Sequence, residues 1–313
     1  MGARRFIPRE GRAEDVPPGT SPRGVGHADA LGGIVAGCLA ARDVFLAVSG
    51  LTDLQARSPY EFAAARKGLP SGLDLGTVHV VGAGGVGSNM LYFAPLIGMR
   101  GRFHIIDHDR VSASNLNRCL MFEEMHARLS HDKARIAKEY IVTRGSRAEA
   151  HVMKYSDFVR ANGRGTPHAV WMMANEDEVW NTVQNNFPPL TFSAATSASW
   201  GIHSARHRPI DDACVACVLG MHDKVELKLA CDEGQVGPPE RRQLGVLPFF
   251  APLAAAVALG HISDELSGGD PPRENLRMTN LAGPYPRILD TRIGRRNGCV
   301  CNAQDAETYK LFI

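Results

Sequence analysis

A glycine-rich turn at residues 82–87 has the spacing of a turn that binds phosphate. It follows a β-branched run at residues 77–81, which is typical of a buried parallel strand, and it precedes a helix predicted over residues 88–97. In such turns glycine permits a tight bend and a close approach of backbone to phosphate, while N–H groups at the helix start hold the anion. The sequence therefore predicts a nucleotide site built on Gly82, Gly84, Gly85 and Gly87.

An acidic residue stands where such a site contacts the ribose. A second strand is predicted over residues 102–106, and Asp107 follows it, about twenty residues after Gly87. A carboxylate at this position can accept hydrogen bonds from ribose hydroxyls. Taken alone, the turn and the acid predict a nucleotide-binding protein and favour a dehydrogenase.

The polar run at residues 107–118 points away from a dehydrogenase. Its sequence, DHDRVSASNLNR, resembles the DxDxVxxSNLxR signature of the ThiF/MoeB superfamily, which contains the ubiquitin-activating enzymes. The resemblance extends from about residue 75 to the end of the chain. It implies ATP-dependent adenylation of a C-terminal carboxylate, with the nucleotide bound by Asp107, Asp109, Asn115 and Arg118.

The resemblance also implies further basic groups at the site. Residues 130–133 resemble the segment that places a lysine on the phosphates, so Lys133 would offset negative charge as the carboxylate attacks the α-phosphate. In related enzymes an N-terminal helical segment lends an arginine to the ATP site of the neighbouring subunit. Arg57 and Arg66 are the candidates here, with a solvated surface position as the alternative for each.

One position departs from the family pattern. After a strand predicted over residues 168–173, the family places an aspartate that helps to hold Mg²⁺ and the adenylate, whereas this chain has Asn175. An amide oxygen can coordinate Mg²⁺ but brings no charge. Three interpretations stay open: Glu176 or Asp177 substitutes, metal binding is weaker, or the site binds nucleotide without turning it over.

Cys231 is a candidate acceptor of the activated carboxylate. It lies in a loop that resembles the one where some family members carry a cysteine that takes up the carboxylate or sulfur. In other members the equivalent cysteine has no such role. Two neighbouring carboxylates, Asp232 and Glu233, would raise the pKa of the thiol unless a nearby arginine folds over it. A covalent role is therefore left open.

Four cysteines form two close pairs that could hold a metal. They are the CxxC pair Cys214 and Cys217 and the CxC pair Cys299 and Cys301. Four thiolates can hold one Zn²⁺ at tetrahedral geometry, and the arrangement matches the family's structural zinc site. The second pair departs from the family pattern, because only one residue separates the cysteines of CxC whereas two separate those of CxxC. The alternative is a set of small buried hydrophobic side chains. The twelve histidines show no HxH or HExxH spacing, which favours a structural or solvated role for each.

The elements that position these groups divide the chain into four parts. We predict a flexible arm (1–27), a helical extension (28–72) with helices near 28–48 and 58–67, an adenylation core (73–200), and a C-terminal part (201–313) with the crossover loop and zinc site. The alanine-rich residues 247–259 predict a buried helix. The predicted fold class is α/β: a Rossmann-like, mostly parallel sheet with helices on both faces and a C-terminal zinc-binding subdomain.

Composition limits the partners and the compartment. The 313 residues carry a formal net charge of +2, with basic and acidic residues interspersed, so we expect no nucleic-acid partner. No apolar run approaches the roughly 20 residues of a membrane span, so we expect no membrane partner. The first residues lack the apolar centre of a signal peptide, and we expect a cytosolic protein. The seven cysteines then favour metal binding or catalysis over disulfides.

The resemblance favours an enzyme that adenylates the C-terminal carboxylate of a small ubiquitin-like or sulfur-carrier protein. It implies ATP, Mg²⁺ and Zn²⁺ as cofactors and a homodimer as the assembly. A peptide-modifying adenylyltransferase, as in nucleotide-peptide antibiotic pathways, would share every core motif and use the N-terminal extension to clamp a peptide. A nicotinamide dehydrogenase would need neither zinc nor the SNLxR run. A non-catalytic scaffold would explain Asn175, but such proteins usually lose the arginine and lysine that this chain keeps.

Overall fold

The computed structural model describes most of the chain between residues 5 and 302. These are residues 5–9, 12–16, 30–51, 61–66, 69, 72–163, 165, 167–174, 176–186, 188–197, 199–219, 247–268, 270 and 272–302.

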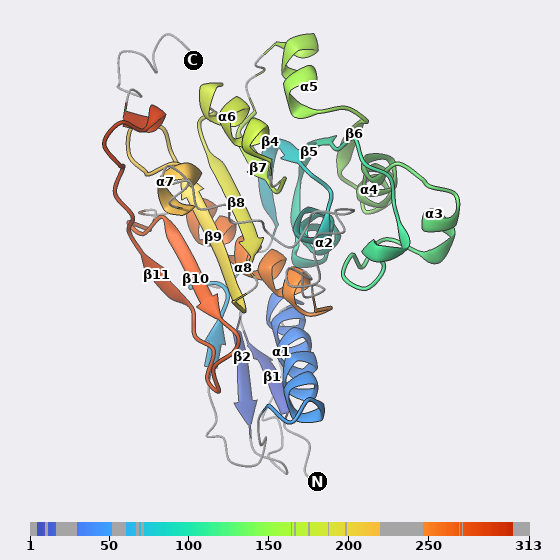
Figure 1. The fold of residues 1–313 in the computed structure, drawn as a ribbon, viewed down its shortest axis with the longest axis vertical. Helices are drawn as coiled ribbons and strands as arrows, with labels where there is room; N and C mark the ends of the chain where they lie inside the picture. The colour runs from blue at the N-terminus through green and yellow to red at the C-terminus, as the bar shows by residue number, and fades with distance from the viewer. Residues whose placement is uncertain are drawn as a thin grey trace, which may run out of the picture.

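An eight-stranded sheet forms the centre of the molecule, in the order β11-β10-β9-β8-β7-β4-β5-β6 (Figure 1). Its parallel part consists of β4 (Leu73–Val81), β5 (Met99–Ile106), β6 (Arg147–His151), β7 (Ala169–Met172) and β8 (Thr191–Thr196). Its antiparallel part consists of β9 (Gly201–His207), β10 (Leu276–Asn280) and β11 (Leu289–Thr291). The prediction of a mostly parallel sheet is confirmed for the core, and one sheet continues through the C-terminal part.

Helices cover both faces of the sheet because the strands are apolar on both sides. Alternate residues of β4 face opposite ways, so Val80 joins one hydrophobic cluster and Val81 the other. The first cluster contains residues of α2 (Gly85–Phe93), α4 (Lys133–Thr143) and α8 (Phe250–Leu266). The second contains residues of α5 (Tyr155–Asn162) and α6 (Asp177–Asn185).

Helix α8 is the most deeply buried helix of the core. All of its residues except the last, Leu266, are buried, as the alanine-rich sequence predicts. It packs against α2, which carries the glycine turn at its start. Shorter elements complete the described chain: the helices α3 (Glu124–Arg128) and α7 (Val215–Leu219) and the 3₁₀ turns η2 (Ala94–Ile97), η3 (Ala113–Asn115) and η6 (Val300–Asn302).

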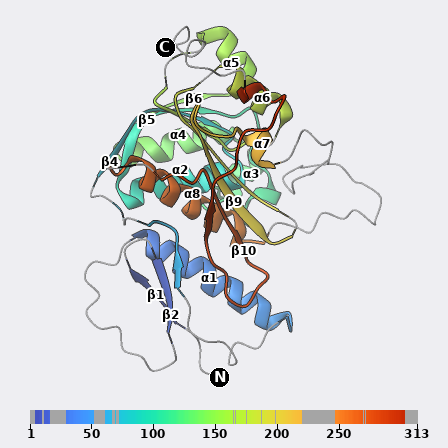
Figure 2. The same ribbon diagram turned by 90° about the vertical axis from the view of Figure 1, so that its left-hand side faces the viewer.

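The N-terminal part forms a small layer below the main sheet (Figure 2). It consists of α1 (Ala30–Val48) and a three-stranded antiparallel sheet made of β1 (Arg5–Arg9), β2 (Arg12–Val16) and β3 (Glu61–Ala63). Both β1 and β2 lie against α1. The helix predicted near residues 28–48 is therefore confirmed as α1.

Two predictions for this part are wrong. The flexible arm predicted over residues 1–27 contains β1 and β2, whose backbone groups pair with each other and with β3. The helix predicted over residues 58–67 is the strand β3 at Glu61–Ala63. Both predictions rest on local composition and capping signals, which pairing between distant strands overrides.

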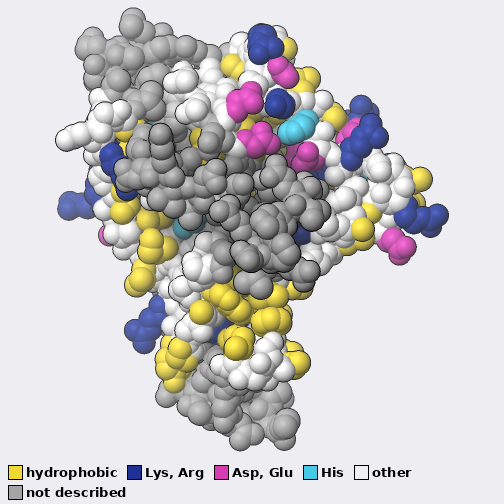
Figure 3. Space-filling view, in the orientation of Figure 1, with side chains coloured by type: hydrophobic (Ala, Val, Ile, Leu, Met, Phe, Trp, Pro, Cys, Tyr) yellow, Lys and Arg dark blue, Asp and Glu magenta, His cyan; other side chains and the backbone are white. Residues whose placement is uncertain are grey.

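Helix α1 also corrects the expectation that no apolar run approaches the length of a membrane span. Among the described residues it is the one helix long and apolar enough to cross a membrane by length and composition, and half of its most apolar window is buried in the protein. It carries the buried pair Arg42 and Asp43, and Arg42 donates to the Leu281 carbonyl at 2.8 Å. Figure 3 shows apolar side chains over the region of α1, where Val44 and Val48 are exposed.

A buried arginine joins the N-terminal layer to the core. Arg277 on β10 donates from Nη2 to Asp264 Oδ2 and from Nε to Asp290 Oδ1, both at 2.8 Å. Its Nη1 donates to the Ala64 carbonyl at 2.6 Å. The Asp264 carboxylate also accepts the Arg66 backbone N–H at 2.8 Å. One guanidinium therefore connects α8, β10, β11 and the segment that follows β3.

We predict that Arg277→Ala destabilises the fold strongly. The substitution removes the Arg277 guanidinium from the fully buried Asp264 carboxylate, and breaking a buried ion pair from one side costs about 3–5 kcal/mol. Arg160→Ala, which removes an exposed pair with Asp157, is the matched control and should change the free energy of unfolding by about 0.5 kcal/mol or less. Urea unfolding of both variants checks this, and equal losses in the two would contradict it.

Candidate active site and metal centre

The glycine turn at the end of β4 is shaped by two close contacts and one open side. Gly82 has a φ of +94°, and a Cβ there would lie 2.8 Å from the Ala174 backbone N. A Cβ at Gly87 would lie 2.0 Å from the Gly82 carbonyl oxygen, so the third glycine lets α2 pack on the turn. A Cβ at Gly84 would meet nothing within 4 Å. The turn is thus closely packed on its inner side and open to an approaching ligand at Gly84.

Asp107 holds this turn in place from the end of β5. Its Oδ2 accepts the Ala83 N–H at 2.6 Å, and its Oδ1 accepts the Asp109 N–H at 2.7 Å. Burial raises the pKa of this carboxyl, while the nearby Lys133 charge and the two N–H donors oppose the rise. The carboxylate predicted to contact a ribose is therefore next to the turn and also braces it.

Lys133 lies beside the same acids. It is the first residue of α4 and is buried, and its Nζ donates to Asp109 Oδ2 at 3.0 Å. The Asp109 side chain is half exposed. The structure therefore brings Lys133 next to Asp107 and Asp109, two predicted nucleotide-binding residues that lie more than 20 positions earlier in the sequence.

Asn115 and Arg118 lie on the loop between β5 and α4. Asn115 is buried, and its Oδ1 accepts the Ser112 N–H at 3.0 Å, which closes a capping box around η3. Arg118 donates from Nη1 to the Ser114 carbonyl and to Asn117 Oδ1. The Arg118 side chain borders the glycine turn. A Cβ at Gly85 would lie 3.5 Å from Arg118 Nε.

A residue that the sequence reasoning missed connects this loop to the turn. Asn89 on α2 is fully buried, and its Nδ2 donates to the Gly85 carbonyl at 2.7 Å and to the Arg118 carbonyl at 2.6 Å. Its Oδ1 accepts the Leu120 N–H at 3.2 Å. A polar amide on the buried face of a helix, just after the glycine turn, was the available signal.

Three predicted catalytic residues, Arg57, Asn175 and Cys231, lie outside the described residues, and their roles stay predictions. Glu176, named as a substitute for the missing aspartate, is exposed at the start of α6. Arg66, the alternative to Arg57, pairs with Asp290 at 2.6 Å and with Glu274 at 3.0 Å. In this chain it is held by two carboxylates of the C-terminal part.

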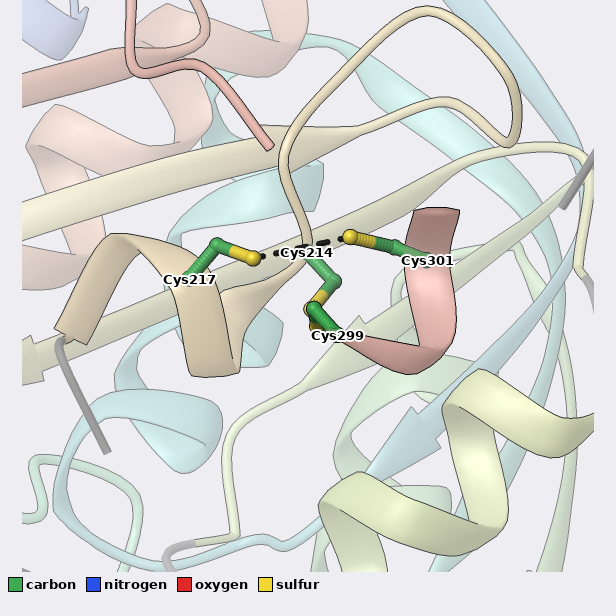
Figure 4. Close-up of side chains that lie close together, drawn as sticks. All are labelled: Cys214, Cys217, Cys299 and Cys301. Carbon is green, nitrogen blue, oxygen red and sulfur yellow. Dashed lines mark hydrogen bonds between the residues drawn. The ribbon is translucent and has the colours of Figure 1, made fainter. Parts of the chain in front are cut away.

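The four predicted zinc ligands come together in the structure (Figure 4). All four cysteines are buried, and their sulfur atoms lie within 4.8 Å of one another. The contacts cross between the two pairs, at 3.4 Å from Cys214 to Cys299 and 3.5 Å from Cys217 to Cys301. Tetrahedral coordination with Zn–S distances of 2.3 Å requires sulfurs about 3.8 Å apart, which this cluster approaches. The geometry is consistent with one zinc site.

The chemistry of the cluster also fits a cation. Burial raises the pKa of Cys217 to about 12, so a thiolate there at neutral pH needs a positive partner. The backbone N–H of Arg296 donates to the Cys217 sulfur at 3.3 Å, an outer contact often seen around metal thiolates. The alternative interpretation, a set of small buried hydrophobic side chains, does not explain why four sulfur atoms converge on one point. Zinc here would hold α7 to η6 and so fix the C-terminal part.

A comparison with protein-family models places this chain. The model described as the ThiF family matches residues 71–312. The chain belongs to the ThiF family. The resemblance inferred from residues 107–118 is confirmed, and the match covers the glycine turn and all four cysteines.

The curated relatives with established names match parts of this ThiF-family chain. SUMO-activating enzyme subunit 2 of Dictyostelium discoideum is 44% identical over 63 residues, which is 20% of this chain and 9% of that protein. The Nedd8-activating enzyme E1 catalytic subunit of Drosophila melanogaster is 35% identical over 99 residues, which is 31% of this chain and 21% of that protein. The chain thus matches only a small part of the length of these relatives.

Among solved structures, E. coli MccB with ATP has a TM-score of 0.54 and 14% identity, covering 72% of this chain and 65% of that one. The microcin C7 biosynthetic enzyme MccB in complex with N-formylated MccA has a TM-score of 0.54 and 17% identity, covering 72% and 67%. At these identities the likeness shows a shared fold. This ThiF-family chain therefore has an adenylyltransferase-like fold.

We predict that Gly84→Ala weakens ATP binding without weakening the fold. Residue 84 has an extended conformation that alanine can adopt, and its open side leaves room for a methyl group but not for both a methyl group and a phosphate. The ATP dissociation constant should rise by about tenfold or more, a loss of about 1.4 kcal/mol, with an unchanged melting temperature. Gly87→Ala should instead lower the melting temperature. Unchanged ATP affinity in Gly84→Ala would contradict a phosphate position at the turn.

We predict one tightly held zinc per chain at the four cysteines. The metal should survive dialysis, and Cys217→Ser and Cys299→Ser should each lose it, because three thiolates no longer complete the tetrahedral set. Elemental analysis of the dialysed proteins measures this. Cys38→Ala is the control, since Cys38 is a buried free thiol of α1 outside the cluster. Full zinc content in both serine variants would rule out the assignment.

Proposed function

We propose that this ThiF-family protein uses ATP to adenylate the C-terminal carboxylate of a peptide. The observation that carries the proposal is the grouping of the glycine turn, Asp107 and Lys133 at the carboxyl ends of β4 and β5. In doubly wound sheets ligands bind at this edge. The peptide reading takes support from MccB, whose solved structures include complexes with ATP and with MccA.

The proposed reaction needs no covalent help from the protein in its first step. A carboxylate oxygen of the peptide attacks the α-phosphorus of ATP, a new P–O bond forms, and the bond to the bridging oxygen of the β-phosphate breaks. Pyrophosphate leaves, and the peptide carries a mixed anhydride with AMP. Arg118 and Lys133 would balance the charge that grows on the phosphate oxygens, and the turn at Gly84 would receive them.

Mg²⁺ fits the acids of this site. The ligand atoms of Asp107, His108 and Asp109 lie within 4.8 Å of one another, and the two carboxylates offer the oxygen donors that Mg²⁺ prefers. The ion would neutralise charge on the phosphates when bound. The partly exposed Asp109 can turn toward an ion, whereas both oxygens of Asp107 already accept backbone N–H groups.

The N-terminal layer is the part of the chain that we assign to peptide binding. Hydrogen bonds of Arg277 and Arg42 connect its three-stranded sheet and α1 to the core. A second layer attached to the core in this way would hold the body of a peptide while its C-terminus reaches the turn. Whether Cys231 then accepts the activated carboxylate, and whether the chain acts as a homodimer, stay predictions.

A second candidate keeps the reaction and changes the partner. Adenylation of a small ubiquitin-like or sulfur-carrier protein was the first expectation, and the partial matches to SUMO- and Nedd8-activating enzymes favour it. Those matches cover 20% and 31% of this chain, and the ThiF family model begins at residue 71, after the N-terminal layer. The peptide reading accounts for that layer and is therefore the one we put first.

ATP–pyrophosphate exchange tests the proposal. The full chain should catalyse exchange with short peptides encoded beside its gene only when they end in a free carboxylate, and not when the same peptides end in an amide. Arg118→Ala should slow exchange by roughly a hundredfold, about 3 kcal/mol, because a fixed cation near the α-phosphate is lost. Arg160→Ala, on the distant helix α5, is the control.

Two outcomes would count against the proposal. Release of ADP and phosphate instead of AMP and pyrophosphate would mean a different attack on ATP. Exchange with a small ubiquitin-like protein, and with no peptide, would favour the second candidate.

A further inference from the structure

Three histidines on neighbouring strands form a row on the face of the sheet that α5 and α6 cover. His79 on β4 pairs in register with His104 on β5, which pairs with Glu149 on β6. His151 lies two residues further along β6, and the period of two along a strand puts it on the same face as Glu149. This cluster lies on the opposite face from α2 and takes no part in the proposed reaction.

The donor atoms of three of these residues converge. His104 Nδ1 lies 3.1 Å from His151 Nε2 and 3.8 Å from Glu149 Oε2. The donor atoms of all three lie within 4.8 Å of one another. Zinc bonds of 2.0–2.1 Å to nitrogen at tetrahedral angles require nitrogens about 3.3 Å apart, close to the spacing seen here. Small rotations of the half-exposed Glu149 can bring its oxygen equally near.

Packing fixes the two imidazole rings in this arrangement. The rings of His104 and His151 are nearly parallel, with an interplanar angle of 13° and centroids 5.4 Å apart. The buried Phe158 of α5 lies against His151 at 4.7 Å and against His104 at 6.2 Å between centroids. The rings are therefore held before any ligand arrives, while Glu149 at the sheet edge leaves one side open to solvent.

We propose that His104, Glu149 and His151 bind a divalent transition-metal ion at a site separate from the four cysteines. Two imidazole nitrogens and one carboxylate oxygen suit Zn²⁺, Ni²⁺ or Cu²⁺ and not Mg²⁺ or Ca²⁺, which prefer oxygen donors alone. Three protein ligands leave at least one coordination position for water or a second molecule. The site therefore differs in kind from the four-cysteine cluster, which is closed.

The site is linked to the nucleotide site through the backbone. The His151 carbonyl accepts the Asp107 N–H at 3.1 Å, and Asp107 in turn holds the glycine turn. An ion that ties His104 to His151 would hold β5 and β6 together next to this hydrogen bond. The ion is not needed for the proposed adenylation, so loss of the metal site and loss of adenylation are separable observations.

Calorimetric titration with Ni²⁺ tests the proposal. The full-length protein is first dialysed so that it keeps only its tightly held zinc, and NiCl₂ is then added. One further equivalent should bind. Glu149→Gln and His151→Gln should each weaken it by about tenfold or more, because loss of an outer contact alone typically costs roughly ten- to a hundredfold in affinity.

A conservative variant and a control variant make the test decisive. Glu149→Gln keeps the shape of a half-exposed side chain and so preserves the fold. His168→Gln, which changes an exposed histidine outside the cluster, should bind Ni²⁺ as the unaltered protein does. Absence of a further equivalent in the unaltered protein, or equal affinity in all variants, would overturn the proposal and leave a hydrogen-bonded histidine pair.

Discussion

The buried carboxylate of Asp107 is the constraint on which the candidate active site depends. A charged group at the end of β5 is costly to bury unless it is paired, and here both oxygens accept backbone N–H groups while Lys133 supplies a cation nearby. Those N–H groups belong to the glycine turn and to the loop that leads to Arg118. One side chain therefore sets the positions of the two segments that would receive a nucleotide.

The four cysteines and Arg277 act in a similar way on the C-terminal part. The cysteine cluster joins α7 to η6, and Arg277 joins β10 and β11 to α8 and the N-terminal layer. Neither connection is made by a hydrophobic contact alone. Both depend on charged or metal-binding groups, and removing one partner leaves the remaining groups buried with an incomplete set of contacts. Single substitutions in the C-terminal part should therefore lower the free energy of unfolding strongly.

The sequence predicts those features that are local or that follow from a motif. Three elements are predicted from their own residue patterns, without knowledge of the segments that they pack against. They are the β-branched strand before Gly82, the apolar strand before Asp107 and the alanine-rich helix α8. Proximity of Lys133 to the nucleotide residues follows from the family resemblance. The four-cysteine cluster is predicted from two close pairs of cysteines, which their spacing in the sequence reveals.

What the sequence does not predict depends on pairing between distant segments. The strands β1 and β2 look like a polar arm, and β3 looks like a helix, until each finds its partner strand. The amide of Asn89 meets its partner, the Arg118 carbonyl, only when that loop folds against α2. The contact between His104 and His151 is likewise not predicted from the sequence, because the two rings meet only when β5 and β6 pair.

The turn after β4 should bind ATP and not a nicotinamide dinucleotide. Isothermal calorimetry on the 313-residue chain tests this expectation, with ATP in the presence of Mg²⁺ in one titration and NAD or NADH in the other. We expect ATP binding in about the micromolar range, near −8 kcal/mol, and no measurable heat with either dinucleotide. Micromolar binding of NAD or NADH together with no binding of ATP would contradict it.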